Sequence, residues 1–491
     1  MVAKPSRQKV FTFGPDLVLA ALVFTCTALL YPPVAQIPAT IVESYNEGWS
    51  AYQVSRAFHG GLYPPIDSLT SNNYPPLYFY LNGLLCPLIG DPIRTGRVLA
   101  LAGLLLTAVN VGLIVFAFDR LPALATIAGL TFLGSMAASF TGYVAMADPQ
   151  WVGHAVMTTG LVLFLYGRGR SALLILSAVT MVLAGLIKHS LVSLPFSVLV
   201  WTLIYERHSY RMWLAASAVA VGAALASLLL LFGPNVFLGI FLTGREYSFL
   251  LSVFNFSEWI TPGLVFVAAS LLFACVRCED RRVRLIQLYV AFAALWGFVT
   301  SGGQGVGFNS LFDLYIALIV LTALGVARCS RTAARSEAAR SIGMAVMALP
   351  VLVATPLEEA RLLDNLRALP ELQRQTTADV AFISAYGGAV ACENLSLCYW
   401  AGKPFSVDFF NTGIKLKAGL IGQEAFASHL RNHEFQLIQI REPRGPSSRL
   451  PEAAWRAIDE HYEIARRSPT GGVFYVPRAG QPGAPKARGR P

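Results

Sequence analysis

The sequence predicts an α-helical polytopic membrane protein, with about eleven transmembrane helices and a small C-terminal extracytoplasmic α/β domain. Two observations support this class. Only 13% of the 491 residues are charged and 55% are hydrophobic, whereas about 25% of a soluble domain is charged. A helix that crosses the hydrocarbon needs about 20 apolar residues, with about 17 tolerated. Eleven runs close to that length carry almost no charge: 16–34, 98–118, 122–140, 151–167, 171–187, 191–205, 212–232, 261–277, 285–299, 311–327 and 342–354.

The first apolar run is expected to remain in the mature protein. Lys4, Arg7 and Lys9 precede it, as they would in a signal peptide. However, Tyr31-Pro32-Pro33 follows it, where a signal peptide would have small residues for cleavage. The run therefore indicates a retained first helix.

The distribution of Lys and Arg predicts the orientation. If the N-terminus is inside, most basic residues between helices fall in cytoplasmic segments, which is the positive-inside pattern. The outer loops ahead of residue 355 hold only Arg56, Arg94, Arg97, Lys188 and Arg245. An odd number of spans then places the C-terminal domain outside the cytoplasm. The net charge of +10 is explained by basic loops beside anionic lipid, without nucleic acid.

Three parts are expected along the chain. Residues 1–355 form the transmembrane domain, including a large first outer loop at 35–96. Residues 356–480 form the α/β domain, and residues 481–491, rich in Gly, Pro, Lys and Arg, form a disordered tail. A structured loop as long as 35–96 is usually functional.

Local patterns predict the elements of the loop and of the C-terminal domain. Residues 47–59 read as an amphipathic helix on the membrane surface, with Asn46 as a plausible cap. Alternation of strands and helices in the C-terminal domain predicts a mainly parallel sheet. The strands are expected at 380–383, 405–407, 435–438 and 473–476, and the helices near 388–400, 422–432 and 451–467.

The cysteines allow one disulfide and disfavour a zinc site. Cys392 and Cys398 lie in the predicted outer domain, where an oxidising compartment permits a bridge between them; the sequence leaves both states open. Cys275 and Cys278 form a CxxC without a second pair or a nearby His, so zinc binding is not expected.

Polar residues gather at the predicted outer ends of the helices, which places any chemistry outside the cytoplasm. Ionisable residues near bilayer depth are functional candidates. The candidates are Glu43, Asn46 and Glu47 after the first helix, and then Arg97, Asp148, Lys188, Arg245, Asn309 and Asp313.

These residue types suit sugar transfer from a phosphate. Glu47, Glu43 and Asp148 are candidates for deprotonating an acceptor hydroxyl, and Glu47 with Asp148 for holding a divalent cation such as Mg or Mn. Lys188, Arg97 and Arg245 are candidates for neutralising a donor phosphate.

Plainer interpretations stay open for most of these residues. Asp148 could be a helix cap, and Lys188 could reach to the headgroups. Arg97 could be a headgroup anchor, and Glu43 and Glu47 could solvate a surface helix.

Two segments of the first outer loop resemble the GT-C superfamily, which includes protein O-mannosyltransferases and aminoarabinose transferases. They are Glu43-Ser-Tyr-Asn-Glu-Gly-Trp-Ser-Ala-Tyr52 and Tyr74-Pro75-Pro76-Leu77. Further matches are Ala147-Asp148, Lys188 and the stretch Gly305…Asn309…Asp313. The resemblance implies a membrane enzyme that takes its sugar from a polyprenyl-phosphate lipid. Where the family has Asp-Glu, this chain has Asn46-Glu47, and a neutral amide accepts no proton, so Glu47 or Glu43 would act instead.

The sequence therefore predicts an inverting GT-C-type glycosyltransferase. Its donor would be a polyprenyl-phosphate sugar, and its acceptor a lipid, a glycan or a protein outside the cytoplasm. Two other classes stay open. A lipid or solute transporter would also have an apolar bundle with charges, and a non-catalytic GT-C-like subunit would explain Asn46.

Overall fold

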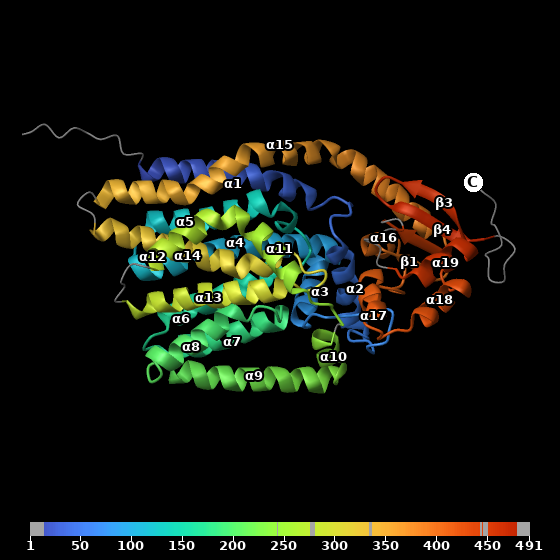
Figure 1. Cartoon of the computed structure of the whole chain (residues 1–491), viewed down its shortest axis with the longest axis horizontal. Coiled ribbons are helices and arrows are strands. Elements are labelled where there is room, and N and C mark those ends of the chain that lie inside the picture. Colours follow the sequence, from blue (N-terminus) through green and yellow to red (C-terminus); the bar gives the residue numbers. More distant parts are fainter. Residues whose placement is uncertain are drawn as a thin grey trace, which may run out of the picture.

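The computed structural model describes residues 14–242, 244–274, 280–332, 336–441, 444 and 450–478. Cys275, Cys278 and the tail at 481–491, about which the sequence made predictions, lie outside the described residues. A helical bundle fills one end of the molecule and a small domain with a sheet fills the other (Figure 1).

Each of the eleven predicted apolar runs corresponds to a helix of the bundle. By length and composition, eight segments of the described chain are suited to crossing a membrane. The number of crossings remains a prediction, because α7 and α8 are shorter than these eight. The helices are α1 (Pro15–Gln36), α4 (Pro92–Asp119), α5 (Pro122–Ser139), α6 (Gln150–Tyr166), α7 (Ser171–Ile187), α8 (Ser193–Tyr205), α9 (Arg211–Phe232), α12 (Leu264–Ala274), α13 (Arg281–Ser301), α14 (Phe312–Thr332) and α15 (Ser336–Ser384).

Helix α15 joins the two ends of the molecule. It has 49 residues, which corresponds to about 74 Å at 1.5 Å per residue, and it runs beside α1 toward the sheet (Figure 1). Residue 355, the expected end of the transmembrane domain, lies inside it. The strand predicted at 380–383 is wrong, since these residues form the last turn of α15. A short apolar run does not by itself distinguish a strand from a buried helical turn.

The C-terminal sheet is mixed, so the prediction of a mainly parallel sheet is wrong. Its order is β1-β2-β4-β3, and only β1 and β2 are parallel. The cause is a hairpin: residues 462–468, which were predicted to be partly helical, form a strand that turns directly into the last one. The strands are β1 (Val390–Cys392), β2 (Leu437–Ile440), β3 (Tyr462–Ser468) and β4 (Gly472–Pro477).

Four helices accompany this sheet: α16 (Leu395–Trp400), α17 (Phe409–Lys417), α18 (Gln423–Arg431) and α19 (Glu452–His461). The strand predicted at 405–407 is wrong, because that stretch has no regular structure. The disulfide that the sequence left open is formed between Cys392 and Cys398. It ties β1 to α16.

The first outer loop lies between the bundle and the C-terminal domain. It folds into α2 (Tyr45–His59) and α3 (Leu77–Ile89), both at the junction in Figure 1. The helix at 47–59 is thus confirmed, but Ser44 and not Asn46 is its N-cap. Its position on an open membrane surface is not confirmed, because every residue from Glu47 to Val54 is buried. A Cβ on Gly48 would lie 2.1 Å from the backbone of Ser396 in α16, so this helix meets the C-terminal domain directly.

Shorter elements complete the bundle and its connections, and the candidate span Phe249–Phe273 includes two of them together with most of α12. They are η1 (Thr141–Tyr143), α10 (Asn235–Phe241), α11 (Phe249–Ile260), η2 (Thr261–Gly263) and η3 (Phe308–Leu311).

Candidate functional site

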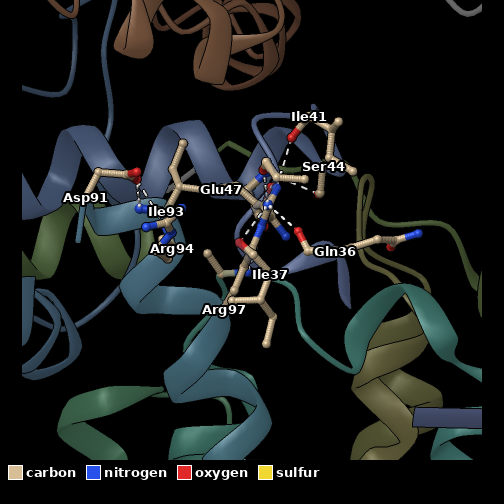
Figure 2. A network of polar contacts seen from close by, with 12 residues as sticks. Gln36, Ile37, Ile41, Ser44, Glu47, Asp91, Ile93, Arg94 and Arg97 are labelled. Carbon is tan, nitrogen blue, oxygen red and sulfur yellow. Dashed lines mark hydrogen bonds and ion pairs between the residues drawn. The ribbon is translucent and has the colours of Figure 1, made fainter. Parts of the chain in front are cut away.

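A closed ion pair between Arg97 and Glu47 lies where α4 meets α2. Arg97 donates from Nε and Nη2 to the two carboxylate oxygens of Glu47, each at 2.7 Å. The remaining donors reach main-chain carbonyls, at 2.7 Å to Ala39 and 2.9 Å to Ile41. Figure 2 shows this guanidinium surrounded by its acceptors. Both side chains are buried, and each of the three guanidinium nitrogens of Arg97 donates to a protein oxygen.

Glu47 also fixes the chain just before Asp148. Its Oε1 accepts a hydrogen bond from the main-chain N–H of Ala147 at 3.1 Å. Glu47 has no exposed surface. A carboxylate held by three donors in this way is built to position its neighbours.

A second ion pair, between Lys188 and Asp148, lies beside the first and is more open. Lys188 Nζ is 3.3 Å from Asp148 Oδ1 and 3.4 Å from the hydroxyl of Tyr74, and it lies over the Tyr74 ring. Asn46 donates to Asp148 Oδ2 at 3.2 Å. Burial alone would lower the pKa of Lys188, but Asp148 and Tyr74 outweigh it, so the net shift of that pKa is upward. Lys188 thus stays charged although it is buried.

Two amide side chains border this pair. The Gln150 main chain donates to Asp148 Oδ1 at 2.8 Å, and its side chain meets that of Asn309 at 2.9 Å. The Asn309 amide also lies beside Lys188: in its alternative orientation, which replaces the donation to Gln150, Asn309 Oδ1 lies 3.2 Å from Lys188 Nζ. The sequence prediction missed Gln150. A polar residue at the start of an apolar helix was the available signal.

Asp313 belongs to a second polar cluster, with His154 and Tyr289. Its Oδ1 is 3.3 Å from His154 Nδ1 and accepts from the Tyr289 hydroxyl at 2.9 Å. His154 contacts Gln150 at 2.6 Å, so the two sites are linked through one side chain. His154 was not predicted, although a His within an apolar helix is a signal of this kind.

Arg245 and His189 lie on the cationic side of the Asp148–Lys188 pair. Burial, with Lys188 and Arg245 nearby, lowers the pKa of His189 to about 4. His189 packs against Tyr74. Among the described residues, the Nε of Arg245 and the Nδ1 of His189 are buried without a hydrogen-bond partner. The Arg245 Nε–H is therefore a donor that no described residue uses.

Glu43 faces a different space from Asp148. It lines a cavity of about 180 Å³ together with Arg97, Thr141 and Glu358. Although part of this residue is exposed, desolvation of its carboxyl in the cavity and the charge of Glu47 raise the pKa of that carboxyl.

The residues do not fit the metal site that was predicted at Glu47 and Asp148. Across the described part of the chain, His, Cys, Asp and Glu side chains form no group of three or more that could hold an ion. Both oxygens of Glu47 are already bound by Arg97, and Asp148 faces Lys188. We therefore derive no chemical step through a metal.

The sequence matches neither a protein-family model nor a curated protein. Its structure matches that of ArnT from Cupriavidus metallidurans in the apo state, with a TM-score of 0.57 and 13% identity over 92% of this chain and 97% of that one. It also matches ArnT from the same organism bound to undecaprenyl phosphate, with a TM-score of 0.57 and 14% identity over 95% of this chain and 98% of that one. The chain has the GT-C fold. The predicted resemblance to GT-C enzymes is thus confirmed at the level of the fold.

The shared fold includes both parts of the molecule. The match covers more than nine-tenths of each molecule, so it includes the helical bundle and the C-terminal domain.

Proposed function

We propose that this chain is a membrane glycosyltransferase that takes its sugar from a polyprenyl-phosphate carrier and transfers it to an acceptor outside the cytoplasm. One observation carries the proposal: a buried lysine, an acid and two amides converge at the end of the bundle next to the C-terminal domain. The ArnT structure that holds undecaprenyl phosphate has the same fold. It supports, for this chain, a donor with a phosphate headgroup.

Lys188 is the proposed ligand of the donor phosphate, with Arg245 beside it. When the bond from the sugar C1 to the phosphate oxygen breaks, its electron pair stays on that oxygen. A cation in a buried site stabilises this developing charge far better than water does. Tyr74 and Asn309 keep Lys188 in place, which avoids reorganisation during the step.

Asp148 is the proposed general base. An acceptor hydroxyl attacks C1, its proton goes to the carboxylate, and the polyprenyl phosphate leaves in the same displacement. A single displacement inverts the configuration at C1. Asn46, a neutral amide, donates to Asp148 and so orients the base without competing for the proton.

The geometry favours a positioning role for Glu47 and Arg97, which the sequence suggested as base and phosphate ligand. The N–H groups of Arg97 already donate to Glu47 and to main-chain carbonyls. Glu47 has no solvent-exposed surface. The pair instead fixes the Ala147 peptide, and with it Asp148.

The Cys392–Cys398 disulfide supports an extracytoplasmic C-terminal domain. Disulfides persist in oxidising compartments and are rare in the cytosol. The distribution of Lys and Arg supports the same orientation, in a bacterial inner membrane.

The proposal is tested by comparing envelope glycolipids and glycans by mass spectrometry with and without the gene. A sugar-modified species should vanish with the gene and return with the wild type. Asp148→Asn and Lys188→Met should fail to restore it. The control Asp280→Asn alters an ion pair with Arg282 at the other end of the bundle and should restore it.

Two results would count against the proposal. Full restoration by Asp148→Asn and Lys188→Met would remove the pair from the mechanism. Movement of labelled lipid by the purified protein, without any change in the glycan profile, would favour the transporter.

A further inference from the structure

Helix α17 of the C-terminal domain holds the main chain of the first outer loop. The Asp408 N–H and the Thr412 hydroxyl both donate to the carbonyl of Leu69, each at 2.8 Å. Lys415 Nζ donates to the carbonyls of Ser68 at 2.7 Å and Thr70 at 3.2 Å. Three consecutive carbonyls are thus bound, so the contact fixes the path of the backbone.

The same helix holds the start of α2 through a buried acid. The Tyr45 hydroxyl donates to Asp408 Oδ1 at 2.5 Å, and the Tyr45 ring packs on Phe410 at 5.0 Å between centroids. Asp408 has no exposed surface and accepts from Asn411 at 2.6 Å. A buried acid with such partners tolerates little displacement, because an unpaired polar group in this place is costly.

The segments that α17 holds lead along the chain to residues that contact the Asp148–Lys188 pair. Tyr45 directly precedes Asn46, whose amide reaches Asp148. Ser71 follows the bound carbonyls, and its own carbonyl accepts from Trp49 at 3.1 Å and Gln53 at 2.8 Å. Three residues later, Tyr74 reaches Lys188.

We propose that Tyr45, Asp408, Thr412 and Lys415 are positioning residues through which the C-terminal domain sets Asn46 and Tyr74 against Asp148 and Lys188. None of the four is a catalytic residue. The inference rests on the proposed function, because it assigns a role toward the phosphate site. It makes the C-terminal domain a structural part of that site, in addition to any part in acceptor entry.

The experiment uses the full-length chain in lipid nanodiscs, with two readouts. Hydrogen exchange of the segment 68–74 reports on the loop, and the dissociation constant for undecaprenyl phosphate reports on the site. Tyr45→Phe removes only the hydroxyl that reaches Asp408, and Lys415→Met removes both carbonyl contacts. Tyr462→Phe is the control, since it removes a phenol hydroxyl bound to the Phe435 carbonyl inside the C-terminal domain.

Exchange in the segment 68–74 should rise about tenfold in Tyr45→Phe and in Lys415→Met, and the dissociation constant should rise by a similar factor, which corresponds to about 1.4 kcal/mol. Tyr462→Phe should change neither quantity. Unchanged exchange in both variants, or faster exchange with unchanged affinity, would overturn the inference. If the wild type itself does not bind undecaprenyl phosphate, the proposed function fails. The hold of α17 on the segment 68–74 is then judged by hydrogen exchange alone. Faster exchange in the variants would support that hold, and unchanged exchange would overturn it.

Discussion

The two ion pairs at the end of the bundle next to the C-terminal domain differ in how completely their donors are used. Arg97 and Glu47 meet through two hydrogen bonds of 2.7 Å, and main-chain groups bind what remains. Lys188 and Asp148 are also buried, yet they lie 3.3 Å apart among amide and hydroxyl groups. A satisfied pair stabilises a structure and resists change, whereas a looser pair can exchange partners with a ligand. Burial of a charge therefore does not by itself indicate catalysis.

The largest effect is expected for Glu47→Gln, on stability. It would leave Arg97 buried without its counter-charge, which costs about 3–5 kcal/mol. Thermal unfolding in detergent measures this loss. The double change Glu47→Leu with Arg97→Leu should be less harmful than the sum of the two single changes, because no charge is left unpaired. Additive losses would show that the two residues do not act as a closed pair.

The next effect is expected for Lys188→Met, on activity. Loss of a cation that faces developing charge lowers the transfer rate about 10²–10³-fold. The same variant should lose less stability than Glu47→Gln, since Asp148 keeps Asn46 and the Gln150 N–H as donors. Rates come from transfer to the native acceptor once the product is identified. A stability loss as large as that of Glu47→Gln would make the two pairs alike and break the comparison.

A smaller effect is expected for the contribution of His189, which lies next to Lys188 in the chain, to the pH dependence of stability. The folded pKa of His189 is about 4, below its ordinary value of 6.5. Between these values the unfolded chain binds a proton that the folded chain does not, so stability falls as the pH decreases from 6.5 to 4. His189→Gln should remove about 1–3 kcal/mol of this dependence. The check is unfolding at pH 7 and pH 4.5, and equal slopes for both proteins would contradict it.

The smallest effect is expected for the ion pair between Arg168 and Glu206, at the opposite end of the bundle. Arg168 is 64% exposed, and exposed pairs contribute about 0–1 kcal/mol. Arg168→Gln should therefore leave unfolding and transfer nearly unchanged. A loss comparable to that of Glu47→Gln would mean that burial and hydrogen-bond closure do not set the order of these effects.

Much of the site could be predicted, because the relevant signals are polar residues in an apolar chain. Asp148, Lys188 and Asn46 stand out in this way, Tyr74 belongs to the Tyr-Pro-Pro-Leu segment that resembles the GT-C family, and the structure brings the four together. The pairing of Glu47 with Arg97 could not be predicted, since 50 residues separate them and no local pattern links them. Gln150 and His154 were not predicted as site residues for a related reason. The sequence shows each as a single polar residue in an apolar helix and does not show which side chain it contacts.

Residue patterns alone predict the helical bundle, the gathering of polar residues at one end of its helices and the helix at 47–59. These follow from local hydrophobicity and periodicity, which neighbouring residues establish among themselves. Only the tertiary structure decided the mixed sheet, the enclosure of Glu47 and the hold of α17 on the first loop. Each of these depends on contacts between residues far apart in the chain, whose free energy appears only when the elements have packed.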